Sequence, residues 1–417
     1  MTSPRPVASP FAFWRELAPG ARRALVAAFA GWGLDAADFT FFLLALPLLR
    51  AEFALSPRDA GLVTTVALLS SAAGGVLAGG LADRFGRVRV LAWTILFYSL
   101  ASAGSASATS VGQLVAWRAL LGLGLGGEWA AGAVLVAESV PAAVRGKALG
   151  LMQSGWAIGY LAAAAAAALV LPTLGWRALF LLGSLPALAV FWIRRRVEES
   201  ANWRAVAPGR RAPFDLAAFA HPPVPVRLAA ALGLSSVVMF AYWGLASWMP
   251  SFLAAPVAEG GAGLGLVRSA LWIVPMQAGA FLGYVATGLA ADRFGRRPAA
   301  AVVLVGAAAI VPIYGLAART PLALLLLAPL VGFLAHGYFS VFGALLAELF
   351  PTAIRATAQG LAYNGGRAVS AFAPAVIGAL AGSRGFGAAL ATTSAFFLAG
   401  ALLLYALPET RGARLED

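Results

Sequence analysis

The stretch GWGLDAADFTFFLLALPLL, residues 31–49, carries two carboxylates, Asp35 and Asp38, within a strongly apolar run. Three residues correspond to about 300° of helical rotation, so both acids fall on nearly the same helix face. A charge at the centre of a bilayer costs at least about 2.5–3.5 kcal/mol, so acids placed there indicate a function. Two neighbouring carboxylates also discourage each other's ionisation, which suits this pair to proton transfer.

Three further ionisable residues lie inside apolar segments: Arg118, Glu128 and Arg367. Tyr363 precedes Arg367 by one helical turn and shares its face, and Asn364 lies beside it. A guanidinium in this setting binds a carboxylate through two parallel hydrogen bonds, while the tyrosine and asparagine can bond hydroxyl or carbonyl groups. We therefore expect Arg367 to anchor an anionic substrate; the alternative is a counter-ion for Asp35 or Glu128.

The other polar residues of the apolar segments each admit two interpretations. Asp35 suits a proton relay or a gate, or else helix packing. Glu128 suits coupling or substrate contact, or else a hydrogen bond to a neighbouring helix. His336 is a lone histidine in an apolar helix; such a residue serves either as a packed, hydrogen-bonded side chain or as a substrate contact that carries a proton.

Composition excludes most soluble classes. Of the 417 residues 61% are hydrophobic and 11% are charged, and the mean hydropathy is +0.84, whereas a soluble domain has about 25% charged residues. The absence of cysteine excludes disulfides, thiol nucleophiles and thiolate metal sites. Two scattered histidines indicate no metal cluster, so we expect no cofactor other than a coupling proton. Neither a nucleophile–base pair nor a nucleotide-binding loop is present, and we expect no enzymatic activity.

Apolar stretches long enough to span a bilayer recur along the whole chain. Twelve are expected, at 24–49, 59–82, 88–108, 112–138, 147–171, 176–193, 228–254, 267–291, 298–317, 321–349, 356–381 and 386–407. With both ends of the chain placed in the cytoplasm, the inside segments hold 22 arginine and lysine residues and the outside loops hold six. This bias predicts that orientation and explains the net charge of +13 without a nucleic-acid partner.

A repeat divides the chain into two halves. GGLADRFGRVR at 79–89 returns as TGLAADRFGRR at 287–297, and ESVPAAVRGKALGL at 138–151 returns as ELFPTAIRATAQGL at 348–361. The offset is 209 or 210 residues in both cases. We therefore predict six-helix bundles at 1–193 and 228–417, joined by a cytoplasmic linker at 194–227. The repeat aligns Gln153 with Tyr363, which adds Gln153 to the expected substrate contacts.

These motifs resemble the major facilitator superfamily along the whole chain. The DRFGR loop of both halves is similar to its cytoplasmic signature, and WRALLGLGLGGEW at 117–129 is similar to its fourth-helix motif. The segments 127–160 and 175–200 resemble the sialate:proton symporter family, which includes sialic acid and lactate permeases. The first-helix aspartates fit that family and the aromatic-acid:proton symporters, and PETRG at 408–412 resembles the end of sugar porters.

The resemblance implies an all-helical membrane protein of twelve spans, with substrate bound between two pseudo-symmetric bundles. It also implies that Asp38 pairs with Arg118: an aspartate beside an arginine stays ionised, and a buried one takes a proton when the arginine moves away. The alternative is a static buried ion pair. A further set of charged residues is expected at cytoplasmic helix ends, as salt bridges that close this side without touching substrate. They are Asp83, Arg84, Arg87, Glu138, Arg145, Asp292, Arg293, Arg296, Glu348 and Arg355.

Together these features predict a secondary transporter that imports a small organic anion with a proton by alternating access. A monocarboxylate such as lactate or pyruvate, or an acidic sugar such as sialic acid, is the expected substrate. The alternatives are an aromatic-acid or sugar uptake porter, a drug exporter, or, in another class, a membrane nutrient sensor. We expect a monomer in the inner membrane, with the bilayer, the anion and the proton as its partners and no nucleic acid.

Overall fold

The chain is described by a computed structural model for residues 13–55, 57–206, 216–318 and 320–415, and it contains helices and no strands over these residues. The first half contains α1 (Phe13–Glu16), α2 (Pro19–Glu52), α3 (Pro57–Phe85), α4 (Arg87–Ala106), α5 (Val111–Ser139), α6 (Arg145–Leu182) and α7 (Ala187–Arg196). Two short helices, α8 (Ala201–Ala205) and α9 (Leu216–Ala220), follow. The second half contains α10 (Val224–Ala254), α11 (Gly265–Phe294), α12 (Arg296–Pro312), α13 (Pro321–Gly337), α14 (Phe339–Leu349), α15 (Arg355–Ser370), α16 (Ala373–Arg384) and α17 (Phe386–Leu403).

Eleven helical spans in the described residues are long and apolar enough to cross a membrane. Twelve were predicted, and the difference lies in Ala142–Arg196, a 55-residue stretch that holds both the fifth and the sixth predicted segment. Within α6, Gly175 adopts φ 73° and ψ −175°, which breaks the helix. A residue with a Cβ atom is strained at such a φ, so glycine marks the turn between the two spans.

Two of the predicted spans are divided near their middle. The segment predicted at 356–381 forms α15 and α16, which are separated at Ala371 and Phe372. Pro374 lies in the first turn of α16 and has no backbone N–H to continue the helical ladder. The segment predicted at 321–349 forms α13 and α14, and the interruption falls at Tyr338.

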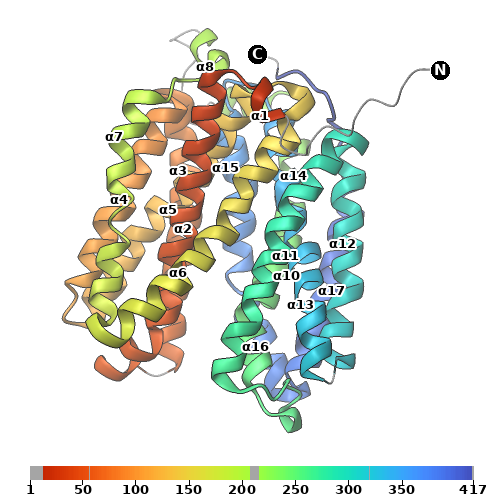
Figure 1. Cartoon of the computed structure of the whole chain (residues 1–417). Coiled ribbons are helices and arrows are strands. Elements are labelled where there is room, and N and C mark those ends of the chain that lie inside the picture. The colour runs from red at the N-terminus through yellow and green to blue at the C-terminus, as the bar shows by residue number, and fades with distance from the viewer. Residues whose placement is uncertain (1–12, 56, 207–215, 319, 416–417) are drawn as a thin grey trace.

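The helices of the two halves stand side by side, as Figure 1 shows, with α2 to α7 on one side and most of α10 to α17 on the other. The halves meet where α3 packs against α15 and where α6 packs against α11. Because the repeat relates α3 to α11 and α6 to α15, these two contacts are equivalent in the two halves. Polar residues that face this seam are therefore positioned between the bundles.

Candidate functional site

A cavity lies between the halves, with walls made mostly of aromatic and aliphatic side chains. Its empty volume, including the part open to solvent, is about 530 Å³. The first half contributes Trp32, Asp35, Phe39, Phe42, Thr64, Ala67, Leu68, Ser71, Arg118, Leu121, Leu125 and Trp156, and the second half contributes Trp243 and Arg367. A smaller adjoining space shares Trp32, Trp156, Trp243 and Arg367 and is also lined by Gln153, Met239, Tyr242, Tyr284, Phe339 and Tyr363.

Arg367 lies at the junction of these two spaces. Its Nη1 donates a hydrogen bond to the hydroxyl of Ser71 on α3 (2.7 Å), and its guanidinium carbon lies 5.3 Å from the ring centroid of Tyr363. The side chain is 7% exposed, and within the described chain no carboxylate forms an ion pair with it. The guanidinium therefore offers free donors to an anion in the cavity.

Tyr363 and Gln153 meet through a third residue, Trp129 of α5. The Trp129 and Tyr363 rings are stacked, with centroids 3.4 Å apart and planes at 14°, and the indole N–H donates to Gln153 Oε1 (3.1 Å). Gln153 and Tyr363, which the repeat aligns in the two halves, thus contact the same indole, and both line the smaller space.

His336 and Asn364 lie behind the cavity wall. The His336 ring packs edge-on against Tyr242 and Tyr284, and its Nδ1 lies 2.9 Å from the carbonyl oxygen of Gly332. The Asn364 amide is fully buried against Gly75 of α3, where a Cβ atom would have no room. Neither residue is among those that line the two spaces.

Asp38 and Arg118 form a buried ion pair, with Arg118 Nη1 and Asp38 Oδ2 3.3 Å apart. The hydroxyl of Ser102 donates to the other Asp38 oxygen. The Arg118 guanidinium also lies over the Phe42 ring, 4.5 Å from its centroid. The pair joins α2 to α5, and Arg118 reaches the edge of the cavity.

Asp35 and Glu128 form a different pair, again between α2 and α5. Their carboxyls interact electrostatically, and that of Asp35 also interacts with Arg367. Both side chains are at most 2% exposed. Within the described residues no hydrogen bond of regular geometry reaches either Glu128 oxygen or Asp35 Oδ1. The structure therefore separates the predicted proton-coupling residues into two pairs rather than one cluster.

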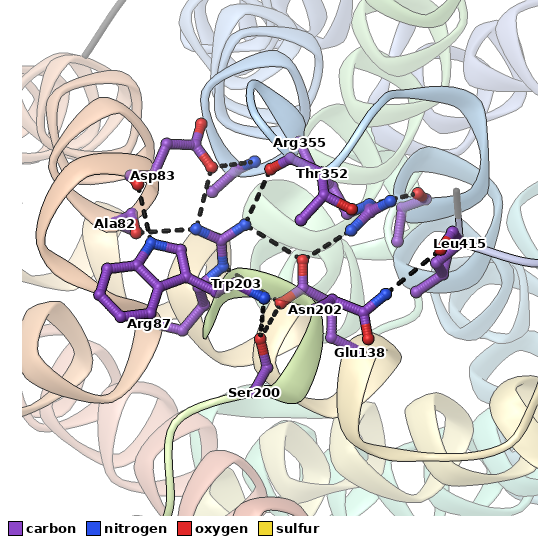
Figure 2. Close-up of polar contacts among 12 residues, drawn as sticks. Ala82, Asp83, Arg87, Glu138, Ser200, Asn202, Trp203, Thr352, Arg355 and Leu415 are labelled. Atoms are coloured by element: carbon purple, nitrogen blue, oxygen red, sulfur yellow. Dashed lines mark hydrogen bonds and ion pairs between the residues drawn. The ribbon is translucent and has the colours of Figure 1, made fainter. Parts of the chain in front are cut away.

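The repeated loop motifs meet at one end of the bundle, which we call the network end. Figure 2 shows that Arg87 lies between Asp83 (3.1 Å) and Glu138 (3.1 Å), and that Glu138 also pairs with Arg355 of the second half (2.7 Å). The Asp83 carboxylate accepts hydrogen bonds from the backbone and hydroxyl of Thr357 at the start of α15. This first network ties α3, α4 and α5 to the second half.

A second network repeats the first with the halves exchanged. Arg296 pairs with Asp292 (2.6 Å) and with Glu348 (2.9 Å), and Glu348 pairs with Arg145 of the first half (2.6 Å). The Asp292 carboxylate accepts from the backbone N–H groups of Gly146 and Lys147 at the start of α6 (2.8 Å each). Eight of the ten residues predicted for this end therefore lie in two equivalent networks.

Arg84 and Arg293, the other two, lie outside these networks. Both are exposed, and their guanidinium carbons lie over the neighbouring Phe85 and Phe294 rings at 5.1 and 5.2 Å.

Each network also contains one glutamate that sequence reasoning missed. Each of these glutamates lies in the segment that follows the last span of its half. Glu199 accepts from the backbone N–H groups of Arg87 and Val88 at the start of α4, and Glu409 accepts from those of Arg296 and Arg297 at the start of α12. A carboxylate is favourable at a helix N-terminus. Burial raises the pKa of Glu199; burial also acts on Glu409, but the backbone donors outweigh it and lower the pKa of that residue.

The residues that follow these glutamates also correspond. Ser200 donates its hydroxyl to Glu138, and Thr410 donates to Glu348 (2.6 Å). Both glutamates and both hydroxyl residues are separated by 210 positions, so the repeat offset was the signal that could have found them.

The C-terminal segment crosses from the second half to the first. Arg145 Nη1 donates to the carbonyl of Ala413 (3.0 Å), and the Asn202 amide donates to that of Leu415 (3.2 Å). Figure 2 shows the contact between Asn202 and Leu415 beside the first network. The network end is thus closed by side chains and by this segment together.

Comparison with known proteins agrees with the fold. The profile of the Major Facilitator Superfamily matches residues 25–287 and 260–416, and the chain belongs to this superfamily of membrane transporters. The solved structure of the proton:xylose symporter bound to 6-bromo-6-deoxy-D-glucose superposes with a TM-score of 0.80 at 20% identity, over 95% of this chain and 98% of that one.

Relatives at higher identity are bacterial transporters. A probable 4-methylmuconolactone transporter of Cupriavidus pinatubonensis is 35% identical over 98% of this chain and 95% of its own length. The cis,cis-muconate transport protein of Acinetobacter baylyi is 34% identical over 91% and 92%. A sialic acid transporter of Escherichia coli is 27% identical over 94% and 95%, so the predicted sialate-type resemblance exists but at lower identity than the muconate type.

Proposed function

We propose that this chain is a proton-coupled symporter for small organic carboxylates, with Arg367 as the residue that binds the carboxylate. The observation that carries the proposal is a buried guanidinium that meets no carboxylate in the described chain and points into a cavity between the halves. An arginine in this state gains most from an incoming carboxylate, which it binds through two hydrogen bonds.

The cavity favours a flat, unsaturated or cyclic carboxylate over lactate or pyruvate. Trp32, Trp156 and Trp243 border both spaces beside Arg367, and aromatic walls gain most from planar partners stacked with an offset. The relatives whose names state muconate and methylmuconolactone support this choice. An acidic sugar is the second candidate, because the relative from Escherichia coli is a sialic acid transporter.

Proton coupling is assigned to the buried acids of α2 and α5. Arg118, 3.3 Å from Asp38, favours the ionised form of that carboxyl; a rearrangement that separates the two leaves a buried carboxylate that gains from a proton. Symport also balances charge, since a proton cancels one carboxylate and each uncompensated charge faces about 2.3 kcal/mol per 100 mV.

The distribution of basic residues supports a cytoplasmic location for the network end, by the positive-inside rule. In that orientation the networks close the inner side, and the form described is outward-facing. Import then requires both networks to open while the outer side closes, which is alternating access between the two halves.

The test is uptake by purified protein in liposomes that contain a pH-sensitive dye. We expect saturable internal acidification with cis,cis-muconate and benzoate, weaker with lactate or sialic acid, absent with a neutral sugar and lost in Asp38→Asn. Empty liposomes correct for diffusion of the free acids. Saturable uptake of labelled muconate without proton entry would contradict the coupling, and absence of uptake of every acid would contradict the transport of carboxylates and favour a sensor.

A further inference from the structure

Asp35 and Glu128 are a carboxyl pair for which the described residues provide no regular hydrogen-bond donor. Both Glu128 oxygens and Asp35 Oδ1 are buried without such a partner. A buried carboxylate without donors loses its hydration and gains nothing in return, so two of them side by side are costly in the ionised form. A proton held between the carboxyls removes one charge and supplies the missing donor.

The backbone makes room for this pair. The Glu128 carboxyl occupies the space in which a Cβ atom at Gly31 would lie, one turn before Asp35 on α2. The glycine therefore lets α5 place a carboxyl directly against α2. The other ionisable groups that interact with the pair are Asp38 on the same helix, Tyr98 on α4 and Arg367 on α15, and the Tyr98 hydroxyl also has no partner within the described chain.

We propose that Asp35 and Glu128 form a second proton-binding site, separate from Asp38 and Arg118, which takes up a proton when a substrate carboxylate binds Arg367. This inference rests on the proposed function, because it assigns the site through which binding and protonation are linked. The proton comes from water, binds a carboxylate oxygen of the pair, and no bond of the substrate changes.

The link follows from the position of Arg367. Asp35 and Arg367 line the same cavity and interact electrostatically, so the guanidinium offsets part of the negative charge of the pair. A bound carboxylate neutralises the guanidinium and removes that support. Uptake of a proton by the pair then restores the charge balance, and the site binds anion and proton together without a change in net charge.

Two measurements on the purified full chain test this inference. The first needs no substrate: infrared difference spectra between acidic and alkaline buffers record the carbonyl band of protonated carboxyls. We expect a band that is lost in both Glu128→Gln and Asp35→Asn and kept in Asp38→Asn. Glu198→Gln removes an exposed carboxyl and is the matched control.

The second measurement follows proton uptake with a pH-indicator dye in weakly buffered detergent solution as benzoate is added, while tryptophan fluorescence reports benzoate binding. We expect Glu128→Gln to bind benzoate and to lose the proton uptake, whereas the exposed control Glu198→Gln keeps it.

The outcomes separate the inference from the function on which it rests. A band that persists in Glu128→Gln, or proton uptake that persists in this variant, would overturn the second site while carboxylate transport stands. If no carboxylate binds the wild-type protein but the band behaves as expected, the proposed function fails and the proton-holding pair stands, without its link to substrate.

Discussion

Arg367 illustrates how one residue can carry the specificity of a cavity. It is held from one side by Ser71 of the opposite half and covers the ring of Tyr363. It lines a cavity with mostly apolar walls, in which water competes poorly for a hydrogen-bond donor. Its planar fork fits a carboxylate in a way that an ammonium group does not.

Substitution of Arg367 is expected to weaken binding rather than folding. A hydrogen bond to a charged group contributes about 1.5–3 kcal/mol, so Arg367→Gln should weaken carboxylate binding by roughly 10- to 150-fold. Arg367→Lys keeps the positive charge but loses the planar guanidinium, so its affinity for the carboxylate should lie between those of the wild type and Arg367→Gln. Tryptophan fluorescence titrated with cis,cis-muconate measures both variants; unchanged affinity in Arg367→Gln would exclude this residue as the anchor.

Sequence reasoning identified the ionisable residues of this site and expected Asp38 to pair with Arg118, but it did not find the uncharged partners. Asp35, Asp38, Arg118, Glu128 and Arg367 were identifiable because a charge within an apolar run is costly and therefore stands out. A serine or a tryptophan in the same run has a small free-energy cost in the bilayer, so it does not stand out in the sequence. The roles of Ser71, Ser102 and Trp129 depend on which helices face each other across the cavity, and a single sequence does not contain that information.

Close packing of helices at glycine positions the polar side chains of the site. At Gly126 of α5 the backbone of α3 approaches so closely that a Cβ atom would overlap the carbonyl oxygen of Ser71. Small residues allow such contacts in membranes, where packing rather than hydrophobic burial drives association. Ser71, which lies at this contact between α3 and α5, also accepts the hydrogen bond from Arg367.

We expect Gly126→Ala to destabilise the protein and Gly233→Ala to have no such effect. The first substitution forces α3 and α5 apart, at a cost of about 1–3 kcal/mol for overpacking. Gly233 lies inside α10 with nothing within 4 Å of the added atom, so the higher helix propensity of alanine applies there. Thermal unfolding in detergent compares them; equal melting temperatures would refute tight packing at Gly126.

Gly31→Ala tests whether the contact between α2 and Glu128 of α5 is needed for proton uptake. The added methyl group displaces the Glu128 carboxyl from its place against α2, while Arg367 and the aromatic walls remain. We expect carboxylate binding to stay close to that of wild type, since Arg367 and the aromatic residues of the cavity are unchanged, and a reduced proton uptake per bound benzoate. Unaltered proton uptake would show that the position of Glu128 does not matter.

The hydropathy of the chain was sufficient to find the spanning elements, but not their interruptions. Each predicted segment falls on helix over the described residues because about 20 apolar residues have no other stable structure in a bilayer. The break at Phe372 and the joining of two spans around Gly175 were not predicted, since glycine and proline are also common inside spanning helices.

At the scale of the whole molecule, we propose that the two networks act as equivalent locks on one end. Each contains buried ion pairs between the halves, and loss of one partner from a buried pair costs about 3–5 kcal/mol. The free-energy difference between two conformations of a protein is also a few kcal/mol. Either network is therefore strong enough to determine which side is open.

We predict that Glu138→Gln shifts the protein toward the state open at the network end, and that Glu138→Gln with Glu348→Gln shifts it further. Spin labels on Arg84→Cys and Arg293→Cys report the distance between the halves, and no native cysteine interferes. Both label positions are exposed and lie outside the networks, so the labelled protein with both glutamates intact is the control. An unchanged distance distribution in the double variant would refute the locks.

The paired contacts of Glu199 with α4 and Glu409 with α12 bear on the ancestry of the chain. Each glutamate lies beyond the last span of its own half and completes the network of that half, together with Ser200 or Thr410. An ancestral gene that encoded a single half would need this tail in order to fold its own network. The duplicated unit therefore extends at least to Ser200 and, in the second copy, to Thr410.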